Sequence, residues 1–275
     1  MTFSPSLMPK KGELHGTPTI ISVSGASRTY PTRSGADVVA LTDVDLTVRR
    51  GNVVSLVGPS GCGKSTLLKM IAGLVEPTTG AVTINDKPAS AGRADCGIML
   101  QSPVLLPWRS TLENILLPVE VLRLDRSSAR ARAMDLIDMV GLRGFEHKQP
   151  WELSGGMQQR ASLARLLIFE PDVLLMDEPF AALDEFTRER LDQEVASLQT
   201  RLNRTIVYVT HNIGEAVALS DEVVVMTPRP GRIVDRVPIE LPKPRTPEVM
   251  DSPEAVSLVA GIRKILANSL SEAQP

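Results

Sequence analysis

The stretch Val53-Val-Ser-Leu-Val-Gly-Pro-Ser-Gly-Cys-Gly-Lys-Ser-Thr66 decides the fold of this chain. Its first five residues form a short apolar run, which is typical of a parallel strand covered on both faces. Of the next nine, the first eight, 58–65, fit the pattern Gly-x-x-x-x-Gly-Lys-Ser/Thr, and Leu67, Leu68 and Ile71 then repeat with a helical period. A strand, a glycine-rich loop and a helix in this order predict a phosphate-binding loop.

Each part of this loop has a physical reason to bind the phosphates of a nucleotide. Glycines let consecutive backbone N–H groups turn inward, and the following helix adds the positive end of its dipole. Lys64 is expected to reach the β- and γ-phosphates of ATP, and the Ser65 hydroxyl to ligate Mg²⁺, which prefers oxygen ligands. We also expect bound nucleotide to shield the Cys62 thiol, with Cys96 as the control. The loop residues predicted to contact ATP are Gly58, Pro59, Ser60, Gly61, Cys62, Gly63, Lys64, Ser65 and Thr66.

The composition excludes several classes of protein. The 275 residues suffice for one sizeable α/β domain with an inserted subdomain, or for two small domains. Two cysteines without a CxxC pair indicate a reducing cytosol. A net charge of −2 and 3% aromatic residues give no basis for nucleic-acid binding. No uncharged apolar run approaches the roughly 20 residues that cross a bilayer, so any membrane role is expected to come through a partner.

The pattern along the chain predicts the α/β fold of a P-loop NTPase. Residues 1–18 read as a disordered tail, and alternation between residues 19 and 48 predicts an N-terminal antiparallel β region. Four apolar runs predict the mainly parallel sheet, at residues 53–57, 173–176, 206–209 and 223–226. An α-helical subdomain is expected as an insertion over about 102–165, with Ser127 as the N-cap of one of its helices. The domain is expected over 19–240, followed by a tail over 241–275 with a helix near 256–270.

Two carboxylates at the end of a predicted strand supply chemistry next to the loop. In Val173-Leu-Leu-Met-Asp177-Glu178, the first acid is predicted to hold Mg²⁺ and the second to polarise the attacking water. His211 follows another predicted strand, where open α/β sheets gather their ligand-binding groups. We therefore predict Glu178, His211 and Lys64 as the catalytic residues.

A second motif, Leu153-Ser-Gly-Gly-Met-Gln-Gln-Arg160, separates this chain from other phosphate-loop proteins. Ser154 is suited to cap a helix, and Gly155 and Gly156 permit close approach of a ligand to the backbone. With both motifs in this order, the chain resembles the ABC ATPases. That resemblance implies that the Ser154 helix faces the γ-phosphate held by another subunit, so that a homodimer buries two ATP molecules.

The resemblance implies roles for three further residues. Gln101 resembles the glutamine that meets Mg²⁺ and senses the permease, and Asp184, in Ala181-Ala-Leu-Asp184, resembles the loop that crosses the dimer interface. Tyr30 resembles the aromatic residue that stacks on adenine, with an ordinary strand tyrosine as the alternative. Gln101 thus joins Ser65 and Asp177 as a predicted metal ligand.

A finer resemblance is to the ATPases of nitrate, sulfonate and taurine importers. It rests on Leu105-Leu-Pro-Trp108, on the second motif, and on the segment from Thr210-His-Asn-Ile-Gly-Glu-Ala to Thr-Pro-Arg-Pro-Gly-Arg232. The chain departs from that family at Asn212, where an acid is usual, and at Gly214, where a charged residue is usual.

This resemblance implies an ATPase that energises import through a separate transmembrane permease. The implied partners are the permease subunits and a periplasmic or lipid-anchored solute-binding protein, and the implied location is the cytoplasmic face of the inner membrane. Residues 105–108 either line the permease contact or pack inside the helical insertion. The alternatives for the whole chain are a soluble ABC-type repair or regulatory ATPase, and a nucleotide-binding module without turnover.

Overall fold

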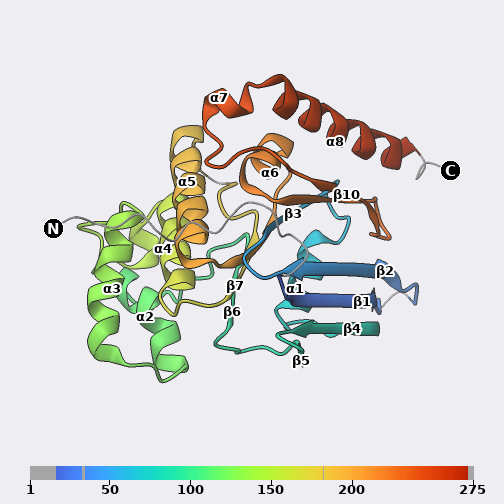
Figure 1. Ribbon diagram of the computed structural model, residues 1–275. Coiled ribbons are helices and arrows are strands. Elements are labelled where there is room, and N and C mark those ends of the chain that lie inside the picture. The colour runs from blue at the N-terminus through green and yellow to red at the C-terminus, as the bar shows by residue number, and fades with distance from the viewer. Residues whose placement is uncertain (1–16, 33–34, 182, 272–275) are drawn as a thin grey trace.

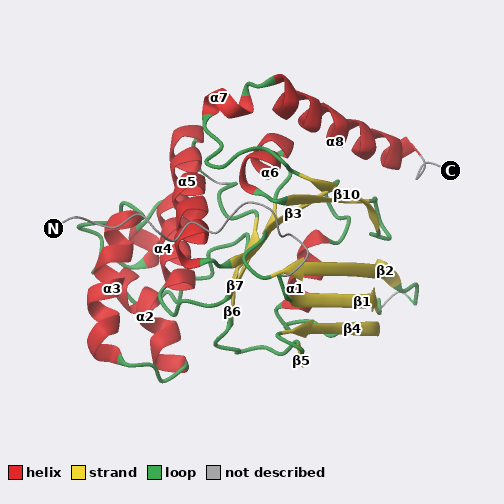
Figure 2. Cartoon of the chain, in the orientation of Figure 1, coloured by secondary structure: helices red, strands yellow, loops and turns green. Residues whose placement is uncertain are grey.

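The computed structural model describes residues 17–32, 35–181 and 183–271 (Figure 1). The predicted N-terminal tail lies outside these residues, except for its last two positions. Strands and helices alternate through most of the chain, and the strands gather into two sheets (Figure 2). The predicted α/β class, with a parallel core, an antiparallel region and a helical insertion, is confirmed.

The larger sheet has six strands in the order β10-β9-β3-β8-β7-β6. All its pairs are parallel except β10 with β9. Every residue of β3, β7 and β8 is buried, which is why these strands read as continuous apolar runs. The bounds are β3 Val53–Val57, β6 Cys96–Met99, β7 Val173–Asp177, β8 Thr205–Val209, β9 Glu222–Met226 and β10 Ile233–Pro238.

The smaller sheet is antiparallel and has the order β2-β1-β4-β5. Val44, Leu46 and Val48 are buried while the residues between them are exposed, as the alternation in the sequence predicts. Its strands are β1 Thr19–Tyr30, β2 Val38–Arg49, β4 Thr79–Ile84 and β5 Lys87–Pro88. Helix α1, Lys64–Ile71, contacts β1, β2 and β4, so this sheet packs against the helix that follows the phosphate loop.

The helical insertion lies on the opposite side of the molecule in Figure 1. It contains α2 Thr111–Val121, α3 Arg126–Met139, the 3-10 turn η1 Pro150–Glu152, and α4 Gly155–Leu167. The prediction that Ser127 caps a helix is wrong, because α3 already begins at Arg126. Asp125 precedes that residue, and its Oδ2 accepts the backbone N–H of Ser128 at 3.4 Å, which satisfies a donor of the first turn.

The remaining helices cover the sheet and follow its strands. They are α5 Glu185–Leu202, α6 Ile213–Leu219, α7 Pro247–Met250 and α8 Pro253–Ser271. Helix α8 packs on the core through Ile262, which belongs to one buried cluster with Val223 and Val225. Arg245, before α7, donates to the carbonyl oxygens of Val217 and Ile239 at 2.7 and 3.1 Å. The domain limits 19–240, 102–165 and 241–275 stay predictions.

Within the described part of the chain, we find no helix that combines the length and the apolar character needed to cross a membrane.

Candidate nucleotide site

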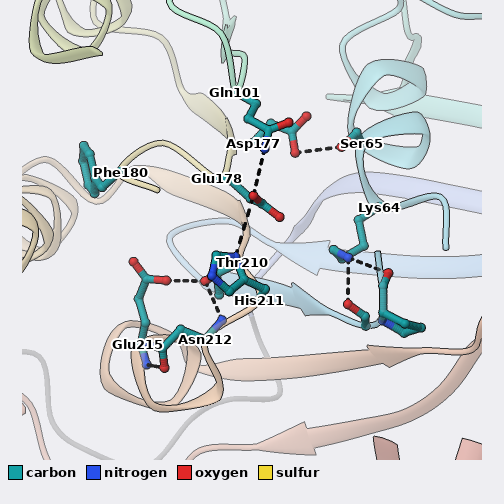
Figure 3. Close-up of polar contacts among 12 residues, drawn as sticks. Lys64, Ser65, Gln101, Asp177, Glu178, Phe180, Thr210, His211, Asn212 and Glu215 are labelled. Carbon is teal, nitrogen blue, oxygen red and sulfur yellow. Dashed lines mark hydrogen bonds and ion pairs between the residues drawn. The ribbon is translucent and has the colours of Figure 1, made fainter. Parts of the chain in front are cut away.

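The predicted phosphate loop connects β3 to α1 at the carboxyl end of the parallel strands. Gly61 and Gly63 have φ of 74° and 103°, which L side chains rarely adopt. A Cβ on Gly63 would also lie 2.6 Å from Cδ2 of Leu41. Lys64 is 6% exposed as a residue, and its Nζ donates to the carbonyl oxygens of Gly58 and Pro59 at 2.8 and 3.0 Å (Figure 3). The loop therefore wraps around a buried ammonium group, as a site for phosphate requires.

The Cys62 side chain is buried beside the Lys64 ammonium group, and its Sγ accepts from Nζ of Lys64 at 3.7 Å. The thiol is 1% exposed and belongs to the main hydrophobic core, so only its backbone can face a phosphate. Alkylation of Cys62 therefore cannot report on bound nucleotide, because the fold already shields this thiol from a reagent in the nucleotide-free protein. Cys96 is a poor control, since burial raises the pKa of its thiol to about 12 and keeps it protonated.

Ser65 and Asp177 meet across 112 residues of sequence. Oγ of Ser65 donates to Oδ1 of Asp177 at 2.9 Å. Burial raises the pKa of Asp177, the hydrogen bond from Ser65 lowers it, and the charge of Glu178 raises it further. A buried carboxylate of this kind gains from a nearby cation.

These two oxygen donors fit Mg²⁺. No cluster of three or more His, Cys, Asp or Glu side chains suited to a metal ion occurs among residues 17–32, 35–181 and 183–271. A dedicated protein cage is not what Mg²⁺ needs, because this ion takes one or two protein oxygens and completes its shell with phosphates and water.

Glu178 lies between two predicted partners. Its Oε2 accepts from Nε2 of Gln101 at 3.0 Å and lies 3.7 Å from Nδ1 of His211 (Figure 3). Its backbone has φ of 45°, and its N–H donates to the Val209 carbonyl at 3.0 Å. Strained backbone often accompanies a functional position. The fold therefore gathers Glu178, Gln101 and His211 from the ends of three neighbouring strands, β7, β6 and β8.

Sequence reasoning missed a set of residues behind His211. The Glu215 carboxylate accepts from the Tyr208 hydroxyl at 2.8 Å and from the Thr210 hydroxyl, while Thr210 Oγ1 accepts the Asn212 N–H at 3.0 Å. Together with Glu178, Phe180, Ala181, Arg188 and His211, these residues line a small pocket. The spacing Asn212-x-x-Glu215 could have revealed them, because it resembles a capping box at the start of a helix.

The departure from the family at Asn212 has a local explanation. Oδ1 of Asn212 accepts the N–H of Glu215 at 3.2 Å and so caps α6. An aspartate performs the same hydrogen bond, so the turn after His211 is kept without the acid. Gly214 lies in the first turn of that helix, where a Cβ would lie 3.2 Å from Oδ1 of Asn212 and so crowd the oxygen that caps α6.

The second motif starts a helix whose first residues face solvent. Ser154 is exposed, and its Oγ accepts the Met157 N–H at 3.3 Å as the N-cap of α4. Gly155 is exposed as well, and a Cβ on Gly156 would lie 2.7 Å from Cδ2 of Leu183. Among the described residues, none of the hydrogen bonds of Ser154 reaches the phosphate loop or Glu178. Within the described residues, the start of α4 is therefore exposed and not hydrogen-bonded to the nucleotide site of its own chain.

Helix α4 also holds the loop that carries Gln101. Gln159 and Ser162 are nearly fully buried, and they donate to the carbonyl oxygens of Gln101 and Pro103 at 3.0 and 2.5 Å. Arg165 donates to the Pro103 carbonyl at 2.7 Å. These hydrogen bonds tie the helix that begins with the second motif to the residue that contacts Glu178.

Among the described residues, no hydrogen bond joins the two other predicted residues, Asp184 and Tyr30, to Glu178, Gln101 or His211. Oδ1 of Asp184 accepts the Thr187 N–H at 2.9 Å. This hydrogen bond is the main reason why the pKa of the Asp184 carboxyl is lowered. Ala182, between the described residues 181 and 183, lies outside the described residues. Tyr30 ends β1, and the Arg28 guanidinium lies 4.6 Å from its ring centroid. The predicted roles of both residues stay predictions.

Comparison with known proteins agrees with this geometry. The model of the ABC transporter family matches residues 41–181. A taurine import ATP-binding protein of Rhizobium johnstonii is 41% identical over 254 residues, which are 90% of this chain and 96% of that protein. An uncharacterized ABC transporter ATP-binding protein of Methanocaldococcus jannaschii is 45% identical over 212 residues, or 77% and 79% of the two chains.

Solved structures show the same fold. A dimeric ATP-binding cassette in a post-hydrolysis state, bound to ADP and phosphate, has a TM-score of 0.74 and 31% identity. The match covers 80% of this chain and 99% of the other. The chain belongs to the ABC transporter family, as an ATP-binding subunit with ATPase activity.

Proposed function

We propose that this chain energises the import of a small solute, of the nitrate, sulfonate or taurine type, through a separate membrane permease. The observation that carries the proposal is the identity of 41% with a taurine import ATP-binding protein over 90% of this chain. Several taurine import ATP-binding proteins from other bacteria share 38 to 41% identity with it.

The proposed assembly is a homodimer at the cytoplasmic face of the inner membrane. Permease subunits and a periplasmic or lipid-anchored solute-binding protein complete it. The exposed start of α4 supports a dimer, because Ser154 and Gly155 present backbone N–H groups that no group of the same nucleotide site occupies. In the proposed dimer, each Ser154 faces the γ-phosphate of the ATP that the other subunit holds.

The side chains of the site have distinct proposed roles in hydrolysis. Lys64 and the loop N–H groups bind and orient the phosphates, and Ser65 and Asp177 hold Mg²⁺. When bound, Mg²⁺ neutralises charge on the phosphate oxygens. Glu178 accepts a proton from the attacking water, and its hydrogen bond with Gln101 orients the carboxylate. His211, 3.7 Å from that carboxylate, donates toward the γ-phosphate.

For residues 105–108, the two alternatives were a contact with the permease and packing inside the helical insertion. Different residues of the segment support different alternatives. Leu105 packs against the buried cluster of the helical insertion, whereas Trp108 is 72% exposed. An exposed tryptophan beside the loop of Gln101 suits the contact with a permease. The relatives that are import ATP-binding proteins disfavour the alternative of a soluble repair or regulatory ATPase.

Replacement of Trp108 with Ala tests the proposed function. We expect the variant to bind the permease roughly thirtyfold more weakly, the effect of removing one interface hot spot. The basal ATPase of the isolated subunit is expected to stay unchanged, because Trp108 is 72% exposed and, among the described residues, no hydrogen bond joins it to the nucleotide site. The measurements are co-purification with the permease and solute-stimulated ATPase in lipid nanodiscs.

Val121→Ala is the matched control, because Val121 is 68% exposed on the same insertion, at the end of α2. A wild-type protein that neither binds a permease nor responds to solute would overturn the proposal. Equal losses in both variants would exclude Trp108 from the contact.

Replacement of Asp177 with Asn is expected to abolish MgATP hydrolysis and leave the nucleotide-free protein at least as stable as wild type. The amide keeps an acceptor for the Ser65 hydroxyl but removes a buried charge. Burial raises the pKa of Asp177 in the folded state above its ordinary value of 3.8. In the wild type, the contribution of Asp177 to the free energy of unfolding therefore falls as the pH rises from 3.8 through the folded pKa. Asp177→Asn has no carboxyl at this position and should not show this decrease in the free energy of unfolding.

Urea unfolding at several pH values, with a phosphate-release assay, measures both effects. Asp235→Asn, on the exposed side of β10, is the control and should show neither. A variant that hydrolyses MgATP at the wild-type rate would remove Asp177 from the metal site.

A further inference from the structure

The turn between β9 and β10, residues 227–232, lies against the phosphate loop although about 170 residues of sequence separate them. The turn is closed by its own hydrogen bonds. The Thr227 N–H donates to the Arg232 carbonyl at 2.9 Å, and Thr227 Oγ1 donates to the Pro230 carbonyl at 3.1 Å. The roles proposed above for nucleotide binding and hydrolysis use none of its residues.

Gly231 fixes the place of this turn. Its N–H donates to the Ala40 carbonyl at 3.0 Å, and its carbonyl accepts the Thr42 N–H at 3.1 Å, so the turn is attached to β2. A Cβ on Gly231 would lie 1.9 Å from the carbonyl oxygen of Cys62. The glycine backbone therefore packs directly on that carbonyl, and only glycine fits there.

Arg229 makes the second contact with the loop. Its Nη2 and Nε lie 3.3 and 3.4 Å from the carbonyl oxygen of Gly61, to which both donate. Within the described residues, no Asp or Glu carboxylate forms an ion pair with this guanidinium. A cation on an exposed residue is thus directed at a backbone carbonyl of the phosphate loop.

The two contacts determine which way the loop N–H groups point. In a planar trans peptide, the C=O of one residue and the N–H of the next point in opposite directions. Arg229 and Gly231 contact the carbonyls of Gly61 and Cys62, so the N–H groups of Cys62 and Gly63 face away from the turn. In the nucleotide-free loop, the Cys62 N–H donates to the Pro59 carbonyl at 3.3 Å, which is also an acceptor of Lys64 Nζ.

We propose that Arg229 is a positioning residue for nucleotide binding, which holds the Gly61–Cys62 peptide with its carbonyl toward the turn and its N–H toward the inside of the loop, where the phosphates bind in the proposed site. The idea rests on the proposed ATP site. In this proposal, the turn at residues 227–232 supports the phosphate loop from its outer side, which neither the loop itself nor α1 does. The guanidinium charge also lowers the cost of bringing a polyanion to the loop.

Replacement of Arg229 with Ala tests the proposal in two ways. In the nucleotide-free protein, we expect the amides of residues 58–66 to exchange with deuterium faster than in wild type. We expect ATP to bind roughly fivefold more weakly, the effect of one hydrogen bond of ordinary net strength. The kcat at saturating ATP should stay within about twofold while KM rises, because the loss concerns ground-state binding.

Arg232→Ala is the matched control. It removes the same charge from the same turn, and the Arg232 contacts that we observe within the turn are made by its backbone. Arg229→Lys should recover part of the ATP affinity, since it keeps a charged donor.

Arg229→Ala with wild-type exchange and affinity, or equal losses in both Ala variants, would overturn the proposal. A wild-type protein that does not bind ATP would instead refute the proposed function.

Discussion

Glu178→Gln is expected to hydrolyse ATP at least about a hundredfold more slowly than wild type, because general-base catalysis typically contributes 10² to 10⁴ in rate. The amide keeps the size of the carboxylate and can still accept from Nε2 of Gln101, which lies 3.0 Å from it. It cannot take a proton from water. ATP binding should survive, since Lys64, Ser65 and Asp177 are untouched and one negative charge beside the γ-phosphate is removed.

The same variant should accumulate as an ATP-bound dimer. In the proposed assembly, ATP bridges Lys64 of one chain and Ser154 of the other, and the variant no longer consumes it. Phosphate release measures the first effect, and size-exclusion chromatography with MgATP measures the second. Glu254→Gln, in the first turn of α8, is the control and should behave as wild type.

Two outcomes separate the chemistry from the assembly. Wild-type turnover in Glu178→Gln would remove this residue from the mechanism. A slow variant that stays monomeric at high protein concentration would leave the chemistry intact but contradict the dimer that encloses ATP.

Ser154→Arg should lose turnover almost completely while the isolated chain still binds ATP. The start of α4 is exposed, and within the described residues no hydrogen bond joins Ser154 to the phosphate loop. A large cation there would occupy the space that the γ-phosphate of the opposite subunit needs. Dimer formation with ATP should fail for the same reason.

Ser154→Ala separates this effect from the loss of a helix cap. Ser154 accepts the Met157 N–H at 3.3 Å, and loss of such an N-cap costs about 1 kcal/mol of stability. Both variants lose the cap, but only the arginine blocks the interface. If Ser154→Arg bound ATP more weakly as a monomer, α4 would act within one chain, and the proposed interface would be wrong.

Local sequence patterns were sufficient for the core of the fold. The strands β3, β7, β8 and β9 are continuous apolar runs because helices and the smaller sheet cover them, and burial on both faces is visible in sequence. The strands β6 and β10 were not predicted. β6 has four residues and includes Gly97, where a Cβ would lie 2.5 Å from Leu166 of α4, so its pattern is too short and too weak.

In the candidate site too, some residues could be predicted from the sequence and others only from the tertiary structure. The phosphate loop is one continuous segment whose chemistry follows from residues next to one another, so its motif alone predicts Lys64 and Ser65. Glu178 and His211 were predicted because acids and histidines at strand ends meet at one edge of a parallel sheet. The hydrogen bond from Gln101 to Glu178, and those that Glu215 accepts from Tyr208 and Thr210, depend on which strands are neighbours and on how the side chains pack.

The sequence by itself thus determined the strands β3, β7, β8 and β9, the phosphate loop and the start of α4, since each depends on the spacing of a few adjacent residues. Only the tertiary structure decided that the Cys62 thiol points into the core, that α8 packs on β9 and β10, and that Arg229 reaches Gly61. These contacts join segments far apart in the chain. They depend on the order and twist of strands and on side-chain packing, which no local pattern encodes.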